Sequence, residues 1–274
     1  MHDKTTVSIA VLSGKGGVGK SNLALNICYG LHQLGNNVLL MDCDMGLANM
    51  DVLLGIAPEK HLQDILLDNQ DPSSILLPIG QTREQRFDLI PANSGMAEFV
   101  DLDAGTRSML RAKLNPLASS YDFLCLDIGA GISPTVMGFG AMAAIRIVVI
   151  TPEPTSLTDS YAMMKVMASR NEVNDFYVLV NQVESSAEAK QTYNRLSGAC
   201  QRFMGFKPIF LGEVRSDRSV VDAVRKQKPL MEVSPHAPAA VNCMEIAHSL
   251  QRLRETLIAE GKLDDPLRRV KFTE

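Results

Sequence analysis

Short runs of consecutive apolar residues alternate along the chain with longer stretches in which apolar residues recur every three or four positions. This alternation is typical of repeated strand–helix units, in which helices cover both faces of a parallel sheet. The pattern predicts strands over Val7–Leu12, Val38–Cys43, Phe87–Ile90, Phe123–Leu126, Ile145–Ile150, Tyr177–Val180 and Ile209–Leu211. We therefore expect an α/β fold with a doubly wound, mostly parallel sheet and helices on both faces.

The stretches between these runs predict helices. One has an apolar face from Leu23 to Leu34, and Gly35 follows where a left-handed cap would end it. The same spacing predicts helices through 157–168 and 244–257. Since no Gly/Ser/Pro-rich linker divides the chain, we expect one domain over residues 1–260 and a C-terminal tail over 261–274.

Composition excludes several classes of protein. The 274 residues are 46% hydrophobic and 21% charged, and the net charge is −4. A protein dedicated to binding nucleic acid usually has an excess of basic residues, which this chain does not have. No apolar run approaches the ~18 residues of a membrane span, and the first residues carry no apolar signal region. The five cysteines form no Cys-x-x-Cys pair, so we expect buried free thiols in a cytoplasmic protein.

The strongest chemical signal directly follows the first predicted strand. Residues 14–21 match G-x-x-x-x-G-K-[ST], and a predicted helix comes next. Glycines let the backbone N–H groups face phosphate oxygens, Lys20 can reach the β- and γ-phosphates, and the Ser21 hydroxyl can ligate Mg²⁺. The residues expected to bind the nucleotide here are Gly14, Lys15, Gly16, Gly17, Val18, Gly19, Lys20, Ser21 and Asn22.

Carboxylates end two of the predicted strands. Asp42 and Asp44 close the second strand, and Asp127 follows Phe123–Leu126. Ligands bind at the carboxyl ends of strands in open α/β sheets, where a carboxylate can hold Mg²⁺ or its waters, or orient an attacking water. Each aspartate taken alone also fits a helix cap or a loop position.

A second lysine, Lys15, is not needed by an ordinary phosphate loop. With it, the segment Lys15–Ser21 resembles the deviant Walker A loop of the MinD/ParA ATPases. The resemblance implies that ATP is bound between the two subunits of a homodimer and that Lys15 reaches the partner's nucleotide. Lys15, Lys20 and Asp44 are then catalytic, with Asp44 positioning the hydrolytic water, and Asp127 corresponds to the Walker B aspartate near Mg²⁺.

The resemblance extends from Val7 to about Leu250. Asp42–Asp51 matches the motif Asp-x-Asp-x-Gly-Leu-x-Asn-x-Asp. Asn181 and Asp217 fall where the family contacts adenine, and an amide can pair with the adenine edge. Asn181 fits a turn equally well, because Asn is common in loops.

Two blocks resemble the flagellar-number regulators of this family, the FleN/FlhG branch. They are Thr151–Tyr161 and Gly46–Gly55. This resemblance implies an ATPase that limits flagellar number at the cell pole and restrains flagellar gene expression through an enhancer-binding activator. The expected partners are a second copy of the chain and either that activator or a polar flagellar protein.

The chain departs from the family pattern at four places. Ile128-Gly129 replaces the usual Ser/Thr-Pro/Ala, and Arg215 stands where a proline is usual. No Asp-Gln-Ala-type arm precedes the first strand, which argues against stimulation of a signal-recognition-type GTPase. The terminal amphipathic segment is also weak: Asp265 and Pro266 can open a short helix with Leu267 and Val270 on one face. We expect at most weak membrane association from it.

Two alternative functions remain open. A MinD-type regulator of the division site would need a convincing membrane tail and a division partner. A ParA-type partition ATPase would bind DNA non-specifically through a basic stretch, although charge runs are usually solvated helix faces, so DNA binding is not expected. That stretch comprises Arg215, Arg218, Arg225, Lys226 and Lys228. The Met-rich stretch Met163–Met167 fits either a docking surface or, more often, the core.

Overall fold

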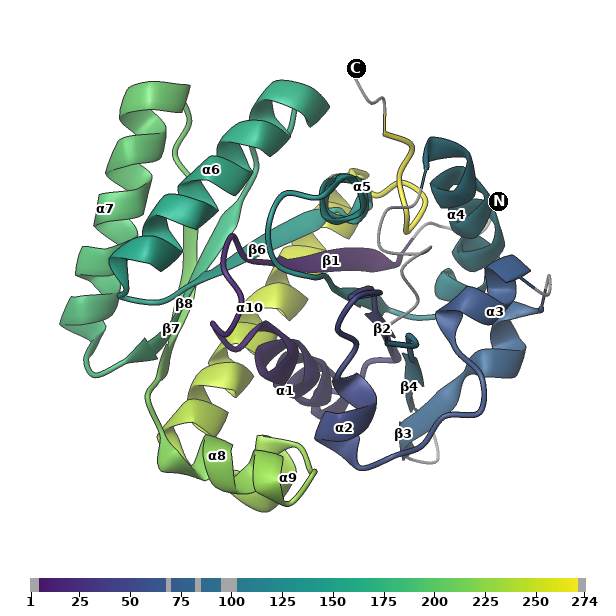
Figure 1. The fold of residues 1–274 in the computed structure, drawn as a ribbon. Helices are drawn as coiled ribbons and strands as arrows, with labels where there is room; N and C mark the ends of the chain where they lie inside the picture. The colour runs from purple at the N-terminus through teal and green to yellow at the C-terminus, as the bar shows by residue number, and fades with distance from the viewer. Residues whose placement is uncertain (1–4, 68–69, 82–84, 95–102, 271–274) are drawn as a thin grey trace.

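The sheet of this protein lies between two layers of helices in the computed structural model, which describes residues 5–67, 70–81, 85–94 and 103–270 (Figure 1). In this part of the chain the strand order is β3-β4-β2-β5-β1-β6-β7-β8, and every neighbouring pair is parallel except β3 with β4. The strands are β1 (Val7–Leu12), β2 (Val38–Asp42), β3 (Leu77–Gln81), β4 (Arg86–Ile90), β5 (Phe123–Asp127), β6 (Ile145–Ile150), β7 (Tyr177–Val183) and β8 (Ile209–Arg215). The expected doubly wound α/β fold is confirmed.

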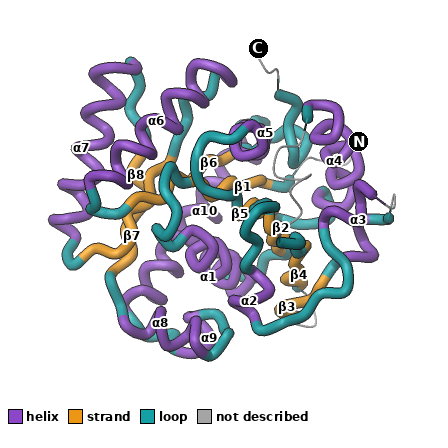
Figure 2. Tube along the Cα trace, in the orientation of Figure 1, coloured by secondary structure: helices purple, strands orange, loops and turns teal. Residues whose placement is uncertain are grey.

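Each face of the sheet has its own hydrophobic core. Along β1 the side chains alternate, so Ile9 and Val11 pack into one core and Ala10 and Leu12 into the other. One face is covered by α1 (Lys20–Gln33), α2 (Met50–Leu54), α8 (Arg218–Arg225), α9 (Leu230–Val233) and α10 (Pro238–Ala259). The other is covered by α3 (Leu62–Leu67), α4 (Ala104–Ala118), α5 (Pro134–Met142), α6 (Pro154–Asn171) and α7 (Ser186–Met204), with the 3₁₀ turn η1 (Pro72–Ile75) beside them. Both helix layers are visible around the strands in Figure 2.

The predicted strands are all present, and the structure adds one. The sequence pattern missed β3, which contains Pro78 and Gly80 and pairs antiparallel with β4 at the edge of the sheet. A proline has no N–H to donate to a ladder, so it is tolerated on such an edge strand but weakens the strand signal in the sequence. Strands β7 and β8 also run past their predicted ends, because main-chain pairing continues through polar residues such as Asn181.

Three local predictions are confirmed by burial and backbone geometry. Gly35 follows α1 with φ 88°, the left-handed conformation expected of its cap. Met163, Met164 and Met167 are fully buried, so the Met-rich stretch is core and not a docking surface. All five cysteines are free and buried, as expected.

The C-terminal segment does not form the predicted amphipathic helix. Leu267 is fully buried, its N–H donates to Asn115 Oδ1 at 2.8 Å, and its carbonyl accepts from Asn115 Nδ2 at 3.1 Å. The Arg268 N–H donates to the Met142 carbonyl at 2.9 Å. Because the Asn115 amide and α5 satisfy these backbone groups, the segment needs no helix, and the side chain expected to face a membrane packs in the core. The prediction of a helix beginning at Pro266 was therefore wrong as far as Val270, and its remaining residues, including Phe272, which was expected near the apolar face, lie outside the described residues.

No helix in the described ranges is both long enough and apolar enough to cross a bilayer.

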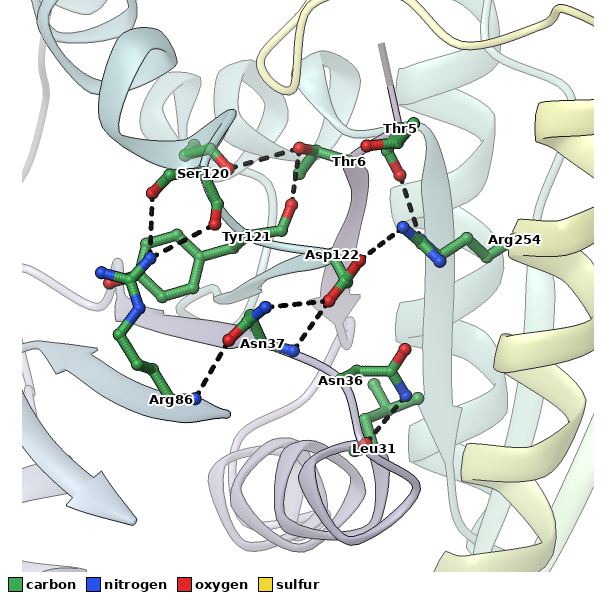
Figure 3. Close-up of polar contacts among 11 residues, drawn as sticks. Thr5, Thr6, Leu31, Asn36, Asn37, Arg86, Ser120, Tyr121, Asp122 and Arg254 are labelled. Atoms are coloured by element: carbon green, nitrogen blue, oxygen red, sulfur yellow. Dashed lines mark hydrogen bonds and ion pairs between the residues drawn. The ribbon is translucent and has the colours of Figure 1, made fainter. Parts of the chain in front are cut away.

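At the amino end of the sheet, Asp122 joins elements that are far apart in the sequence (Figure 3). Its Oδ1 accepts a hydrogen bond from Arg254 Nη2 at 2.6 Å, and its Oδ2 accepts the backbone N–H of Asn37 at 2.8 Å. Arg254 also donates through Nε to the Thr5 carbonyl at 3.0 Å. One carboxylate thereby ties α10 to the segments that lead into β1, β2 and β5.

We expect the Asp122→Ala substitution to lower the free energy of unfolding by about 2–3 kcal/mol, measured by urea denaturation. The partly buried Arg254 guanidinium and the Asn37 N–H would both lose their acceptor. Glu255→Ala is the matched control, because it removes an exposed carboxylate from α10 and should change stability by no more than about 0.5 kcal/mol. Equal effects of the two substitutions would contradict a role for Asp122 in joining these elements.

Candidate functional site

The loop between β1 and α1 has the backbone conformation that its glycines predict. Gly17 and Gly19 have φ values of 79° and 89°, in the left-handed region where L side chains are strained. A Cβ at Gly19 would also lie 2.5 Å from Asn181 Nδ2. The Ser13 hydroxyl donates to the Lys15 carbonyl at 2.7 Å, which closes the start of the loop. The predicted phosphate loop therefore lies at the N-terminus of α1, where a helix favours anions.

Asn181 and Asp217 lie together beside this loop, and both make structural contacts. Asn181 Nδ2 donates to the Val18 carbonyl at 2.8 Å, so the amide braces the phosphate loop from the end of β7. Asp217 accepts the backbone N–H groups of Ser219 at 2.8 Å and Ala239 at 3.2 Å, capping α8 and holding the start of α10. Both residues line a cavity of about 200 Å³ that Gly19 and Asn22 also line. Contact with adenine stays a prediction for both.

Two acidic side chains are buried side by side at the carboxyl end of the sheet. Asp42 and Asp127 are partners in the register of the parallel strands β2 and β5, and each is 1% exposed. Burial, and then the neighbouring Asp127 charge, raises the pKa of Asp42. Burial also raises the pKa of Asp127, although the Ser21 hydroxyl and the Lys20 charge act in the opposite direction. The folded protein therefore disfavours two full negative charges here.

The backbone of the segment after β2 donates hydrogen bonds to the carboxylate of Asp42. It accepts N–H groups from Asp44 at 2.9 Å, Asn49 at 3.2 Å and Met50 at 3.3 Å. These bonds hold residues 44–50 over the end of the sheet, so Asp42 positions the segment that carries Asp44. A direct part for Asp42 in binding Mg²⁺ stays a prediction.

Asp127 has the environment expected of a carboxylate that binds a cation. Neither of its oxygens makes a hydrogen bond within the described residues, and both are buried. Ser21 lies close enough to lower the pKa of Asp127, but outside hydrogen-bonding geometry. A buried, unpartnered carboxylate next to a phosphate-loop hydroxyl fits Mg²⁺, which takes few protein ligands and keeps several waters. Ser21 would ligate the ion, and Asp127 would hold its waters.

Asp44 lines a cavity of about 620 Å³ at the carboxyl end of the sheet. Lys20, Ser21, Asp44 and Gly129 all contribute to its lining. Asp44 Oδ1 accepts the Leu47 N–H at 3.0 Å, and a Cβ at Gly129 would lie 3.2 Å from Asp44 Cγ. The departure from the family pattern at Gly129 thus makes room for the Asp44 carboxylate, a relation that the sequence alone did not indicate.

Lys15 is held by the start of α6. Its Nζ donates to Glu153 Oε2 at 2.5 Å and to Thr155 Oγ1 at 3.0 Å. One residue earlier, the loop packs so closely on the helix that a Cβ at Gly14 would lie 2.1 Å from the Asp159 carbonyl carbon. The phosphate loop and α6 are therefore in direct contact, although 138 residues separate Lys15 from Glu153 and no local signal pairs them.

We expect Asp127→Asn to raise the melting temperature of the nucleotide-free protein by about 2–4 °C, which corresponds to about 1 kcal/mol. The substitution keeps the shape of the side chain and removes one of two adjacent buried charges whose environment disfavours them. Differential scanning fluorimetry at pH 8 measures the shift. Asp88→Asn is the control: Asp88 is also buried but accepts the Tyr121 hydroxyl at 2.6 Å, so this variant should melt lower. A destabilised Asp127→Asn protein would contradict the expectation.

Comparison with known proteins places this site in a family. The model of the AAA domain family AAA_31 matches residues 6–183. Antiactivator FleN of Pseudomonas aeruginosa is 34% identical over 242 residues, 88% of this chain and 85% of that protein. Flagellum site-determining protein YlxH of Helicobacter pylori is 30% identical over 272 residues, 95% of this chain and 86% of that protein.

Solved structures share the fold at lower identity. The septum site-determining protein MinD from Pyrococcus horikoshii, complexed with Mg-ADP, superposes with a TM-score of 0.72 at 20% identity, over 90% of this chain and 97% of that one. A ParA family ATPase from Chlorobium tepidum gives a TM-score of 0.74 at 21% identity, over 90% and 99% of the two chains. The family model, the two curated relatives and the phosphate loop agree, and the chain belongs to the AAA_31 family as an ATPase of the MinD/ParA type.

Proposed function

We propose that this protein is an ATP-dependent dimerising switch that controls flagellar number and placement through a partner that regulates flagellar genes. The observation that carries the proposal is the contact between the phosphate loop and α6, in which Glu153 and Thr155 hold Lys15. It joins the nucleotide site to one of the two blocks that resemble the flagellar regulators. The names of two relatives, an antiactivator and a flagellum site-determining protein, point the same way.

The residues of the phosphate loop and its neighbours have separate roles in the proposed hydrolysis of ATP. Lys20 and the loop N–H groups hold the phosphates, and Ser21 and Asp127 hold Mg²⁺, which neutralises phosphate charge when bound. Asp44 lies in the same cavity and positions the attacking water. We expect slow turnover, because a switch has to remain in each state long enough for partners to respond.

Exposed apolar side chains beside the nucleotide cavity support dimerisation on ATP. Leu47 and Val52 line this cavity and are 76% and 62% exposed, and Ile132 is 55% exposed near it. Such side chains on a hollowed, charged surface are typical of an interface that a second protein covers. In the dimer, Lys15 leaves Glu153 and Thr155 and contributes its charge to the nucleotide of the partner subunit.

We propose that the partner binds the surface at α6, and that its affinity for this surface depends on whether ATP or ADP is bound. Because Lys15 and Gly14 touch the first turns of α6, a change at the phosphate loop reaches this helix directly. A partner that binds the ATP dimer more tightly than the ADP monomer then shifts the monomer–dimer equilibrium toward the dimer. The size of the shift is set by the difference between its affinities for the two forms.

The basic stretch offers little support for the alternative of DNA binding. Arg215 donates to the Glu184 carbonyl at 2.6 Å and lies near Glu213, and Lys228 pairs with Glu232. Binding to DNA phosphates requires basic side chains, and in this protein Arg215 and Lys228 already contact groups of the chain itself. A steep fall of any DNA binding with salt would favour the partition role instead.

Three substitutions separate the steps of the proposed cycle. Lys20→Ala should abolish ATP binding, because the phosphates lose their fixed cation. Lys15→Ala should bind ATP as a monomer within about threefold of wild type, while hydrolysis falls by two or more orders of magnitude, in line with the loss of a charge supplied in trans. Asp44→Ala should bind ATP and accumulate as a dimer with little hydrolysis. Equilibrium binding, phosphate release and light scattering measure the three steps.

Wild-type hydrolysis by the Lys15→Ala protein would overturn the role of Lys15 in trans. Lys165→Ala, on the same helix as the contact residues but away from the loop, is the matched control and should leave all three steps unchanged.

The cellular role is tested by replacing the chromosomal gene with the Lys20→Ala form and counting flagella by electron microscopy. We expect more flagella per cell, or flagella at the wrong place, since the switch can no longer restrain its partner. Normal flagella together with misplaced septa would favour the MinD-type role, and normal flagella with plasmid loss would favour the ParA-type role.

A further inference from the structure

A second cavity, about 370 Å³ in volume, lies between α4, the end of α5 and the C-terminal segment. Four arginines line it: Arg107 and Arg111 from α4, and Arg268 and Arg269 from the C-terminal segment. Among the described residues it shares no lining residue with the nucleotide cavity. We propose that this arginine-lined cavity is a binding site for a phosphate group, separate from the ATP site and completed by the docked C-terminal segment.

The arginines of this cavity are held in place by the fold. Arg107 is 7% exposed and crosses α5 at Gly138, where a Cβ would lie 2.7 Å from Arg107 Cδ. Arg268 is positioned by its own N–H bond to the Met142 carbonyl, and the Asn115 amide clamps the preceding residue. The cavity is therefore built from a rigid helix pair and a segment that side-chain and backbone contacts fix.

The described residues that line this cavity include four arginines and no carboxylate. Arg111 and Arg269 make no hydrogen bond or ion pair with any described residue. Arg268 Nε lies 3.8 Å from Asp264 Oδ2, but Asp264 is 71% exposed and the Nε has no hydrogen-bonding partner in the described ranges. Asp103 caps α4 and accepts the Thr106 N–H at 2.7 Å. Among the described residues, Arg111 and Arg269 thus bring two unpaired guanidinium groups to this cavity, beside Arg107 and Arg268.

The excess charge also reaches the buried Arg146 nearby. Burial first, and then the Arg268 charge, lowers the pKa of Arg146, although its ion pair with Asp175 acts in the opposite direction. Like charges gathered in a partly buried cavity repel one another, so an anion bound among them would stabilise the fold.

A phosphate group is the anion that this arrangement fits best. The planar guanidinium presents paired N–H donors that match phosphate oxygens in a bidentate way, and arginine is the residue favoured for such recognition. Arg107 and Arg111 lie on the first two turns of α4, where the helix dipole also favours negative charge. The phosphate could belong to a soluble phosphorylated compound or to a lipid headgroup, which present the same chemistry.

The test is a titration of the full chain with inorganic phosphate, by isothermal calorimetry in saturating Mg²⁺ and ADP so that the phosphate loop is occupied. Wild type should show saturable binding, and the double variant Arg111→Gln/Arg269→Gln should bind at least about tenfold more weakly, since it loses two charge-assisted contacts. Arg225→Gln, which removes one exposed arginine of α8, should bind as wild type does. Asn115→Ala, which releases the C-terminal segment but keeps all four arginines, should also bind more weakly.

A second arm identifies the source of the phosphate. The same proteins are sedimented with vesicles of phosphatidylglycerol and phosphatidylcholine, and with phosphatidylcholine alone. Phosphate binding together with sedimentation that needs both phosphatidylglycerol and the arginines assigns a lipid headgroup, whereas phosphate binding without sedimentation assigns a soluble ligand. No saturable phosphate binding, or equal binding by wild type and the double variant, overturns the proposal. Affinity for ADP is measured on every variant, so a folding defect or a failure of the nucleotide site is recognised separately.

Discussion

Two carboxylates that must be buried next to each other shape the functional end of this protein. Asp42 and Asp127 end adjacent parallel strands in register, so their side chains meet where water is excluded. Asp42 is stabilised by three backbone N–H groups from the segment that follows it, and this requirement folds the segment over the end of the sheet. Asp44 reaches the cavity as a consequence. Asp127 has no such donors among the described residues, and its buried, unpartnered carboxylate fits the Mg²⁺ site that we propose beside Ser21.

The two ends of the sheet therefore have opposite characters. At the amino end, Asp122 has partners on both oxygens and links α10 to the beginnings of several strands (Figure 3). At the carboxyl end, the Asp127 carboxylate has no hydrogen-bonding partner within the described ranges, and apolar side chains such as Leu47 face solvent. A satisfied network keeps one end rigid, while the unsatisfied groups at the other are free to bind ligands and partners.

Helix α6 contacts both the phosphate loop and the hydrophobic core on one face of the sheet. Its first turns contact the loop through Lys15 and Gly14, and its buried methionines pack in the core on the same side of the sheet. That core also contains Leu267 of the C-terminal segment. The proposed partner surface and the proposed phosphate site are thus built on one helix layer, the layer that does not contain α1.

The sequence by itself determined whatever depends on neighbours in the chain. Periodicity identified seven strands of the sheet, and the glycines of the phosphate loop indicated their own left-handed backbone, because these are local properties of a few consecutive residues. Only the tertiary structure decided which side chains meet once distant strands are ordered in a sheet. Asn181 braces the loop across 163 residues, and Asn115 captures Leu267 across 152, turning an expected membrane face into core. Such contacts leave no periodic trace in the sequence, since they arise from the order of the strands and the packing of the helices upon them.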